Sequence, residues 1–145
     1  MKKDIKEPRI LNWEWFRIRI HTMILELKDY RPDVVIGVSR GGLIPAVRLS
    51  HRLKIPLGII HSRSYVGQTS SPVKVWGLTF PMTDGGWSQW ENKKILIVDD
   101  ILDSGSTKKE VLGYLKIYRF KKVKFITMIT KRKGDKRWVT FPWEF

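Results

Sequence analysis

A short apolar run that ends in paired acids is the feature that most constrains how this chain can fold. Residues 95–107 have the sequence ILIVDDILDSGST, in which four apolar residues, three of them β-branched, lead directly into two aspartates. A run of this kind is typical of a strand that is buried on both faces. Such strands occur in parallel sheets covered by helices, and ligands bind those sheets at the carboxyl ends of the strands. The stretch therefore predicts an α/β fold with a binding site beside the aspartates.

The rest of the chain alternates between strand and helix patterns. Strands are expected over four short apolar runs, residues 33–38, 57–62, 94–99 and about 123–130. Helices are expected over residues 11–29, 43–53 and about 107–119, and Asn12 is the expected N-cap of the first. There is no internal repeat and no interdomain linker, so residues 1–145 are expected to form one domain. The expected fold is a single parallel sheet flanked by helices, a Rossmann-like arrangement.

The segment from residue 63 to residue 92 differs in composition from the rest. It is rich in Gly, Ser, Thr and Pro, although VKVWGLTF at residues 73–80 favours a strand or a hairpin. A segment of this length with little regular structure is more often a functional lid than a plain connection. A long mobile loop over the site is therefore expected.

The loop DSGST at residues 103–107 has the composition of a phosphate-binding loop. Small residues let the backbone curl so that successive N–H groups point at one anion, and a helix beginning near Thr107 would add the positive end of its dipole. Ser104, Ser106 and Thr107 add hydroxyl donors. These features predict a site for a monophosphate, and the alternative is a helix-capping turn that binds nothing.

The neighbouring Asp99 and Asp100 would repel a phosphate, so they need a different role. Paired carboxylates can accept hydrogen bonds from vicinal sugar hydroxyls or help to hold Mg²⁺. A phosphate site next to a diol or metal site fits a ribose 5-phosphate. The alternative is a pair of strand-end carboxylates in solvent.

The charge of the chain favours anionic partners without selecting one. Lys and Arg number 28 against 14 Asp and Glu, and residues 108–137 hold twelve basic residues against two acidic ones. This field would attract a phosphorylated metabolite or a nucleic acid, unless it is only a solvated face. The absence of cysteine excludes disulfides and thiolate chemistry. No run approaches the roughly 18 apolar residues of a membrane span, and the N-terminus lacks a secretory pattern, so a cytoplasmic protein is expected.

Several stretches resemble the type I phosphoribosyltransferases. VDDILDSGST at residues 98–107 is similar to the signature of that family. Residues 34–53 resemble its first strand, diphosphate loop and following helix, and SRSY at residues 62–65 resembles the start of its mobile catalytic loop. Residues 131–145 are similar to the base-contacting end of the short bacterial 6-oxopurine enzymes. The resemblance spans roughly residues 33–145, but residues 66–92 do not match the loops of the family.

The resemblance implies transfer of the 5-phosphoribosyl group from 5-phosphoribosyl 1-diphosphate (PRPP) to a base nitrogen, with Mg²⁺ as cofactor and diphosphate as product. It implies that the loop SRGG binds the diphosphate and that its glycines tolerate a strained peptide there. The PRPP-binding residues would be Ser39, Arg40, Gly41, Gly42, Asp99, Asp100, Ser104, Gly105, Ser106 and Thr107. Asp99 and Asp100 would also hold the metal, directly or through the ribose and diphosphate. Ser64 and Tyr65 would shield the reacting sugar from water.

The resemblance also implies how a purine would be bound. Asp103 would face N7 of the base and accept its proton, Lys131 would contact the 6-oxo group, and Trp138 would stack on the ring. The carbonyl of Val139 would contact the 2-substituent. The hood, which is the part of the family fold that covers the base, would be minimal. Without the resemblance, Lys131 is a surface charge and Trp138 belongs to the core or to an interface. The three histidines, His21, His51 and His61, are expected to be structural or on the surface.

Two other functions stay open. The family includes non-catalytic RNA-binding regulators, and the basic segment could meet RNA. An enzyme acting on a different base is the other alternative. The acids at positions 99, 100 and 103 favour the enzyme, because an RNA-only role needs no three carboxylates beside a phosphate loop. By the same resemblance, the enzyme would be a homodimer or a homotetramer.

Overall fold

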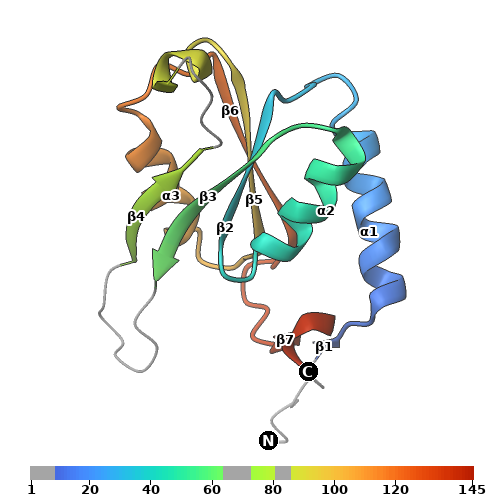
Figure 1. The fold of residues 1–145 in the computed structure, drawn as a ribbon. Coiled ribbons are helices and arrows are strands. Elements are labelled where there is room, and N and C mark those ends of the chain that lie inside the picture. The colour runs from blue at the N-terminus through green and yellow to red at the C-terminus, as the bar shows by residue number, and fades with distance from the viewer. Residues whose placement is uncertain (1–8, 64–72, 81–85) are drawn as a thin grey trace, which may run out of the picture.

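The computed structural model describes residues 9–63, 73–80 and 86–145. Its centre is a five-stranded sheet in the order β4-β3-β2-β5-β6 (Figure 1). The strands are β2 (Val34–Ser39), β3 (Leu57–Arg63), β4 (Lys74–Thr79), β5 (Lys94–Leu102) and β6 (Lys122–Thr130). Strands β3, β2, β5 and β6 are parallel to one another. The predicted α/β fold is confirmed, and its sheet is mainly parallel.

Helices cover both faces of this sheet. Helices α1 (Trp13–Glu26) and α2 (Leu43–Leu53) lie on one face, and α3 (Ser106–Leu115) lies on the other (Figure 1). Alternate residues of β5 point to opposite faces of the sheet. Leu96 and Val98 pack with α1 and α2, whereas Ile95 and Ile97 pack with α3. Burial of both sets explains the nearly continuous apolar run in the sequence. As predicted, Asn12 caps α1, and its Oδ1 accepts the Trp15 N–H at 2.8 Å.

The segment around Trp76 forms the strand β4, one of the two structures predicted for it. It pairs antiparallel with β3 through a bulge between Ile59 and His61, so the sheet is mixed at this edge and not wholly parallel as expected. Two other elements end at different residues than expected. Helix α3 ends at Leu115, earlier than expected. Strand β5 continues past the aspartates to Leu102, because Ile101 and Leu102 extend its ladder with β6.

The ladders around β5 open a crevice at the aspartates. The pairing of β5 with β2 ends at Val98, whereas its pairing with β6 continues to Leu102. On the other side, β2 stays paired with β3 up to Ser39. The two halves of the sheet therefore separate at Asp99, at the carboxyl ends of the strands, where ligands bind in sheets of this type.

A small second sheet closes this end of the molecule. Strand β1 (Arg9–Ile10) pairs in parallel with β7 (Val139–Thr140), and the 3-10 helix η2 (Pro142–Glu144) follows (Figure 1). Trp143 stacks on Phe141 at 4.7 Å between ring centroids and meets Phe16 of α1 edge-on. This aromatic contact ties the C-terminal segment to the helical layer. The sequence did not indicate the β1–β7 pairing.

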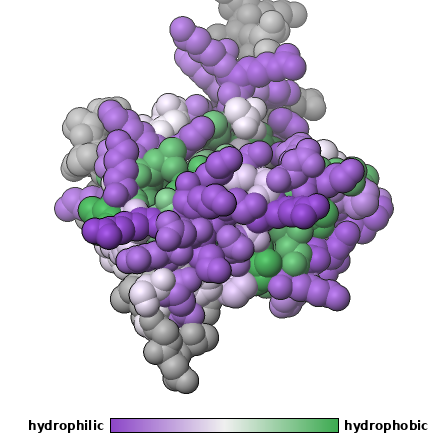
Figure 2. Space-filling view, turned by 90° about the horizontal axis from the view of Figure 1, so that it is seen from above, coloured by the Kyte–Doolittle hydropathy of each residue, from purple (hydrophilic) through white to green (hydrophobic). Residues whose placement is uncertain are grey.

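The opposite end of the molecule is mainly hydrophilic (Figure 2). Exposed basic residues precede the strands there: Lys28, Arg31, Lys54, Lys93 and Lys121. The 3-10 helix η1 (Gly86–Trp90) lies before β5. Among the described parts of the chain, no helix is long and apolar enough to cross a membrane.

Candidate active site

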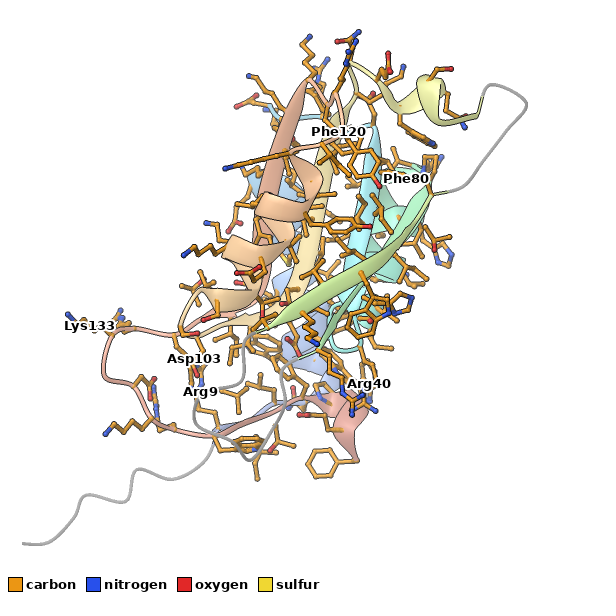
Figure 3. All side chains as sticks on the ribbon, turned by 90° about the vertical axis from the view of Figure 1, so that its left-hand side faces the viewer. Arg9, Arg40, Phe80, Asp103, Phe120 and Lys133 are labelled. Carbon is orange, nitrogen blue, oxygen red and sulfur yellow. The ribbon has the colours of Figure 1, made fainter. Side chains whose placement is uncertain are left out.

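A cavity of about 1160 Å³ lies at the carboxyl ends of the strands. The loops that follow β2 and β5 line it, together with the ends of β3 and β4 and with η2. Arg40 and Asp103 project from this end of the molecule, opposite the end that carries Phe80 and Phe120 (Figure 3). The cavity therefore brings together the two loops that the sequence singled out.

The loop between β2 and α2 is pressed against β5. The Ser39–Arg40 peptide in this loop is cis. The Gly42 N–H donates to the Val38 carbonyl at 2.9 Å. A Cβ on Gly42 would collide with the carbonyl oxygens of Val38 and Val98, and a Cβ on Gly41 would overlap the carboxylate of Asp100. Both glycines are thus required for this close approach, although Gly42 itself lies behind the cavity wall as the N-cap of α2.

The two aspartates of β5 are held by backbone hydrogen bonds. Asp99 Oδ1 accepts the Asp100 N–H at 2.8 Å, and Asp100 Oδ1 accepts the Ile101 N–H at 2.7 Å. Asp99 is buried, with 8% of its surface exposed, so it is not a solvated strand-end carboxylate. Burial and the charge of Asp100 raise the pKa of Asp99. Burial also raises the pKa of Asp100, with a contribution from the charge of Glu144.

The cavity favours a metal ion that takes most of its ligands from water and from a bound substrate. The buried Asp99 and the partly buried Asp100 both have raised pKa values, so a nearby positive charge would stabilise their ionised forms. Among the residues that the structure describes, no group of three or more His, Cys, Asp or Glu side chains is arranged to hold a metal ion. Mg²⁺ commonly binds through one or two carboxylates and completes its shell with water and substrate phosphates. Asp99 and Asp100 fit that mode of binding.

The loop before α3 leaves the start of that helix open to an anion. Gly105 adopts a φ of +84°, and α3 begins at Ser106, one residue before the expected start. The N-cap Gly105 has no side chain to cap the helix, and the Ser106 N–H donates to Ser104 Oγ at 3.3 Å. The first backbone bond of the helix runs from the Lys109 N–H to the Gly105 carbonyl at 3.0 Å. The N–H groups of the first turn therefore have no acceptor within the helix. Ser104 Oγ and Ser106 Oγ lie 3.0 Å apart and add hydroxyl groups at the same point.

Asp103 lines the cavity and contacts Lys131, which is not among the described residues that line it. Lys131 Nζ lies 3.6 Å from Asp103 Oδ2, and the Lys131 N–H donates to the Leu102 carbonyl at 2.8 Å. The β5–β6 ladder places the two residues together because it runs to the end of both strands. The side chain of Lys131 is only 12% exposed, whereas that of Asp103 is 68% exposed. Lys131 is thus not a solvated surface charge.

Trp138 and Val139 lie in the small second sheet. Trp138 is 73% exposed, so it does not belong to the core, and neither residue is among the described residues that line the cavity. Val139 is aligned with Arg9, whose N–H donates to the Trp138 carbonyl at 2.9 Å. In a parallel ladder the residue aligned in this way directs its own N–H and C=O away from the partner strand. The N–H and C=O of Val139 therefore point away from β1. Ser64 and Tyr65 lie outside the described residues.

The cavity lining includes residues that the sequence analysis did not predict as site residues, among them two from η2 and two from the β3–β4 pair. Trp143 and Glu144 come from η2, and Glu144 is fixed by a bond from the Phe141 N–H at 2.6 Å. His61 and Trp76 come from β3 and β4. The sequence did hold an indication for His61, because it lies at the end of a predicted strand and the preceding predicted strand leads into SRGG. No signal pointed to Trp76 or to the path of the last residues.

Comparison with known proteins identifies the family. The profile of the phosphoribosyl transferase domain matches residues 9–145. The chain belongs to the phosphoribosyltransferase family. The predicted membership is confirmed, and the match reaches beyond the resemblance to include β1 and α1. The β1–β7 ladder is thus part of the family domain in this phosphoribosyltransferase.

Individual relatives cover nearly the whole phosphoribosyltransferase. It is 28% identical to the xanthine-guanine phosphoribosyltransferase of Cereibacter sphaeroides, over 99% of this chain and 92% of that protein. It is 32% identical to the hypoxanthine-guanine phosphoribosyltransferase of Staphylococcus aureus, over 93% of this chain and 76% of that protein. Among solved structures, the purine phosphoribosyltransferase from Pyrococcus horikoshii superposes with a TM-score of 0.77 at 32% identity, covering 96% of this chain and 95% of that one.

Proposed function

We propose that this phosphoribosyltransferase transfers the 5-phosphoribosyl group of PRPP to a 6-oxopurine, which is hypoxanthine, guanine or xanthine, and releases diphosphate. The observation that carries the proposal is the order of groups around one cavity. The acid pair of β5, then Asp103 with its partner Lys131, and then the start of α3 follow one another where β5 leads into α3. The relatives named for xanthine, guanine and hypoxanthine support the choice of base.

The sugar would lie between the two loops. Its 5-phosphate would bind the loop Ser104–Thr107, where hydroxyls and open N–H groups favour an anion. The ribose hydroxyls would donate to Asp99 and Asp100. The diphosphate would then lie at Ser39–Gly42, with Arg40 as the cation that neutralises the leaving group.

Mg²⁺ would be held by Asp99 and Asp100 together with the ribose and diphosphate of PRPP. When bound, the ion supplies positive charge that stabilises the departing diphosphate. The acid pair would bind the ion through its negative charge. In the unliganded cavity that charge is unfavourable, as the raised pKa values of both carboxyl groups indicate. PRPP binding and ionisation of the pair should therefore be coupled.

The base would be bound at Asp103 and Lys131. The carboxylate of Asp103 would accept the proton that the base loses, and Lys131 Nζ would donate to the 6-oxo group. The two groups lie 3.6 Å apart, which suits adjacent positions on one edge of a purine. Trp138 would stack on the ring with its exposed face, the Val139 carbonyl would accept from a 2-substituent, and Ser64 and Tyr65 would shield the sugar.

Two further features of the enzyme stay predictions. We also expect the enzyme to be a homodimer or a homotetramer and to be cytoplasmic. A different base is less well supported, because an acid paired with an amine matches the N7 and 6-oxo edge of a purine. An RNA-only role would leave three carboxylates beside the phosphate loop without a purpose.

The test is diphosphate release from PRPP and Mg²⁺, with hypoxanthine, guanine, xanthine, adenine, orotate and uracil each offered alone. We expect turnover with one or more of the 6-oxopurines and none with orotate or uracil. Turnover restricted to a pyrimidine would replace the base in the proposal. Silence with every base, while PRPP still binds, would contradict the proposed transfer and favour a regulator.

A further inference from the structure

His61 forms a pair with the first residue of the loop between β2 and α2. Ser39 and His61 are aligned on neighbouring parallel strands, so their side chains point to the same face of the sheet. The Oγ of Ser39 and the Nδ1 of His61 lie 3.0 Å apart, and both residues line the cavity beside Arg40. The imidazole thus contacts the segment proposed to hold the diphosphate.

The β4 strand fixes the orientation of the His61 ring. Trp76, aligned with His61 across the antiparallel ladder, stacks on it with 5.9 Å between ring centroids and 21° between planes. Gly77 follows with a φ of +66°, and a Cβ there would come within 2.8 Å of His61 Cδ2. Trp76 therefore supports one face of the imidazole, and Gly77 leaves room for its Cδ2 edge.

The hydrogen bond can run in two directions, with different results for an anion. A serine hydroxyl has one proton and two lone pairs. If Ser39 donates to Nδ1, it presents only lone pairs to the cavity and would repel a phosphate oxygen. If the Nδ1–H of His61 donates to Ser39 Oγ, the hydroxyl proton of Ser39 is free to donate to that oxygen.

We propose that His61 is a positioning residue of the diphosphate site, which donates from Nδ1 to Ser39 Oγ and so directs the Ser39 hydroxyl proton at the leaving diphosphate. The inference rests on the proposed function, since it takes SRGG as the diphosphate loop. No bond to His61 forms or breaks. Its contribution is to the binding of a diphosphate or diphosphate ester, whereas the base is proposed to bind at Asp103 and Lys131.

Three substitutions at His61 separate the hydrogen bond from the ring. His61→Phe keeps an aromatic face for Trp76 but removes Nδ1. His61→Asn can place an amide nitrogen near the position of Nδ1, whereas His61→Gln places it near Nε2. The readouts are the Kd of inorganic diphosphate with Mg²⁺, by calorimetry, and the KM values for PRPP and for the purine base.

We expect His61→Phe and His61→Gln to raise the diphosphate Kd and the PRPP KM about five- to tenfold, the effect of one lost hydrogen bond of ordinary strength. His61→Asn should stay within about twofold of the parent. The KM for the base should not change in any variant. An unchanged Kd in His61→Phe would overturn the proposal, as would an equal loss in His61→Asn, because the ring and not Nδ1 would then matter.

A double-mutant cycle tests the route through Ser39. In a Ser39→Ala background the His61→Phe substitution should have no further effect on the diphosphate Kd. Additive losses would overturn the relay, because His61 would then act independently of Ser39. If the parent turned over no purine but His61→Phe still lost diphosphate affinity, the proposed function would fail while the role of His61 would stand.

Discussion

The carboxylate of Asp100 occupies the space in which a side chain at Gly41 would begin. The loop between β2 and α2 is therefore in direct contact with the acid pair, although 58 residues lie between Gly41 and Asp100 in the sequence. A crevice between β2 and β5 allows this contact, because the ladder joining the two strands ends at Val98. The geometry makes the glycine and the acid parts of one site.

Gly41→Ala should therefore damage PRPP binding. The added methyl group must displace either the loop or the Asp100 carboxylate, and overpacking of this kind costs about 1–3 kcal/mol. We expect a lower melting temperature and a PRPP KM raised about tenfold or more. Gly113→Ala is the matched control, because a Cβ at that helical glycine meets nothing within 4 Å. Equal behaviour of the two variants would contradict the proposed contact.

Asp103→Asn should slow turnover while leaving the fold intact. Removing a general acid–base group lowers kcat by roughly 10²-fold or more. The side chain is 68% exposed, so thermal unfolding should be close to that of the parent. Steady-state kinetics with a 6-oxopurine gives kcat, and the exposed Glu110→Gln on α3 is the control. A kcat equal to that of the parent would remove Asp103 as the proton acceptor.

Trp138→Ala should weaken base binding without affecting stability. Aromatic stacking contributes about 0.5–1.5 kcal/mol beyond area burial, so the KM for the purine should rise about two- to tenfold. Phe145→Ala removes another exposed aromatic residue, at 84% exposure against 73% for Trp138. It should change neither the KM for the purine nor the KM for PRPP. If both substitutions acted alike, Trp138 would have no specific role in binding the base.

The unliganded protein should lose stability as the pH rises. Burial raises the pKa of Asp99 in the folded protein above its value in the unfolded chain. Its proton is thus bound more tightly when folded, and the resulting stability is fully present below about pH 4. That stability is lost as the pH rises through the folded pKa, by up to about 1.4 kcal/mol per pH unit for one proton.

The measurement is the free energy of unfolding in urea at several pH values, for the parent and for Asp99→Asn. The difference between the two curves should change with pH over the range above pH 4, because the amide does not titrate. Parallel curves would mean that Asp99 has the same pKa in both states.

The strands and the site edge could be predicted because each rests on a local pattern. The run Ile95–Val98 indicates a buried strand, and Asp99 and Asp100 follow it at the edge where parallel sheets bind ligands. The DSGST loop indicates an anion site because small residues precede a helix. These inferences need only neighbouring residues, so they hold without knowledge of the distant chain.

The features that were missed depend on pairing between distant segments. Nothing near Arg9 predicts that it aligns with Val139 in a two-residue ladder. The pairing of His61 with Ser39 follows from the register of β2 and β3, and a shift of one residue would turn His61 to the opposite face. The stacking of Trp76 on that ring requires β4, which the sequence left as a strand or a hairpin.

Identification of the nucleotide product tests the central claim most directly. The protein would be incubated with PRPP, Mg²⁺ and an equimolar mixture of hypoxanthine, guanine, xanthine and orotate, and the products identified by mass spectrometry. We expect 6-oxopurine nucleoside 5′-monophosphates from the parent, and about 10²-fold less of them from Asp103→Asn. Orotidine 5′-monophosphate as the main product, or no nucleotide from a protein that binds PRPP, would contradict this claim.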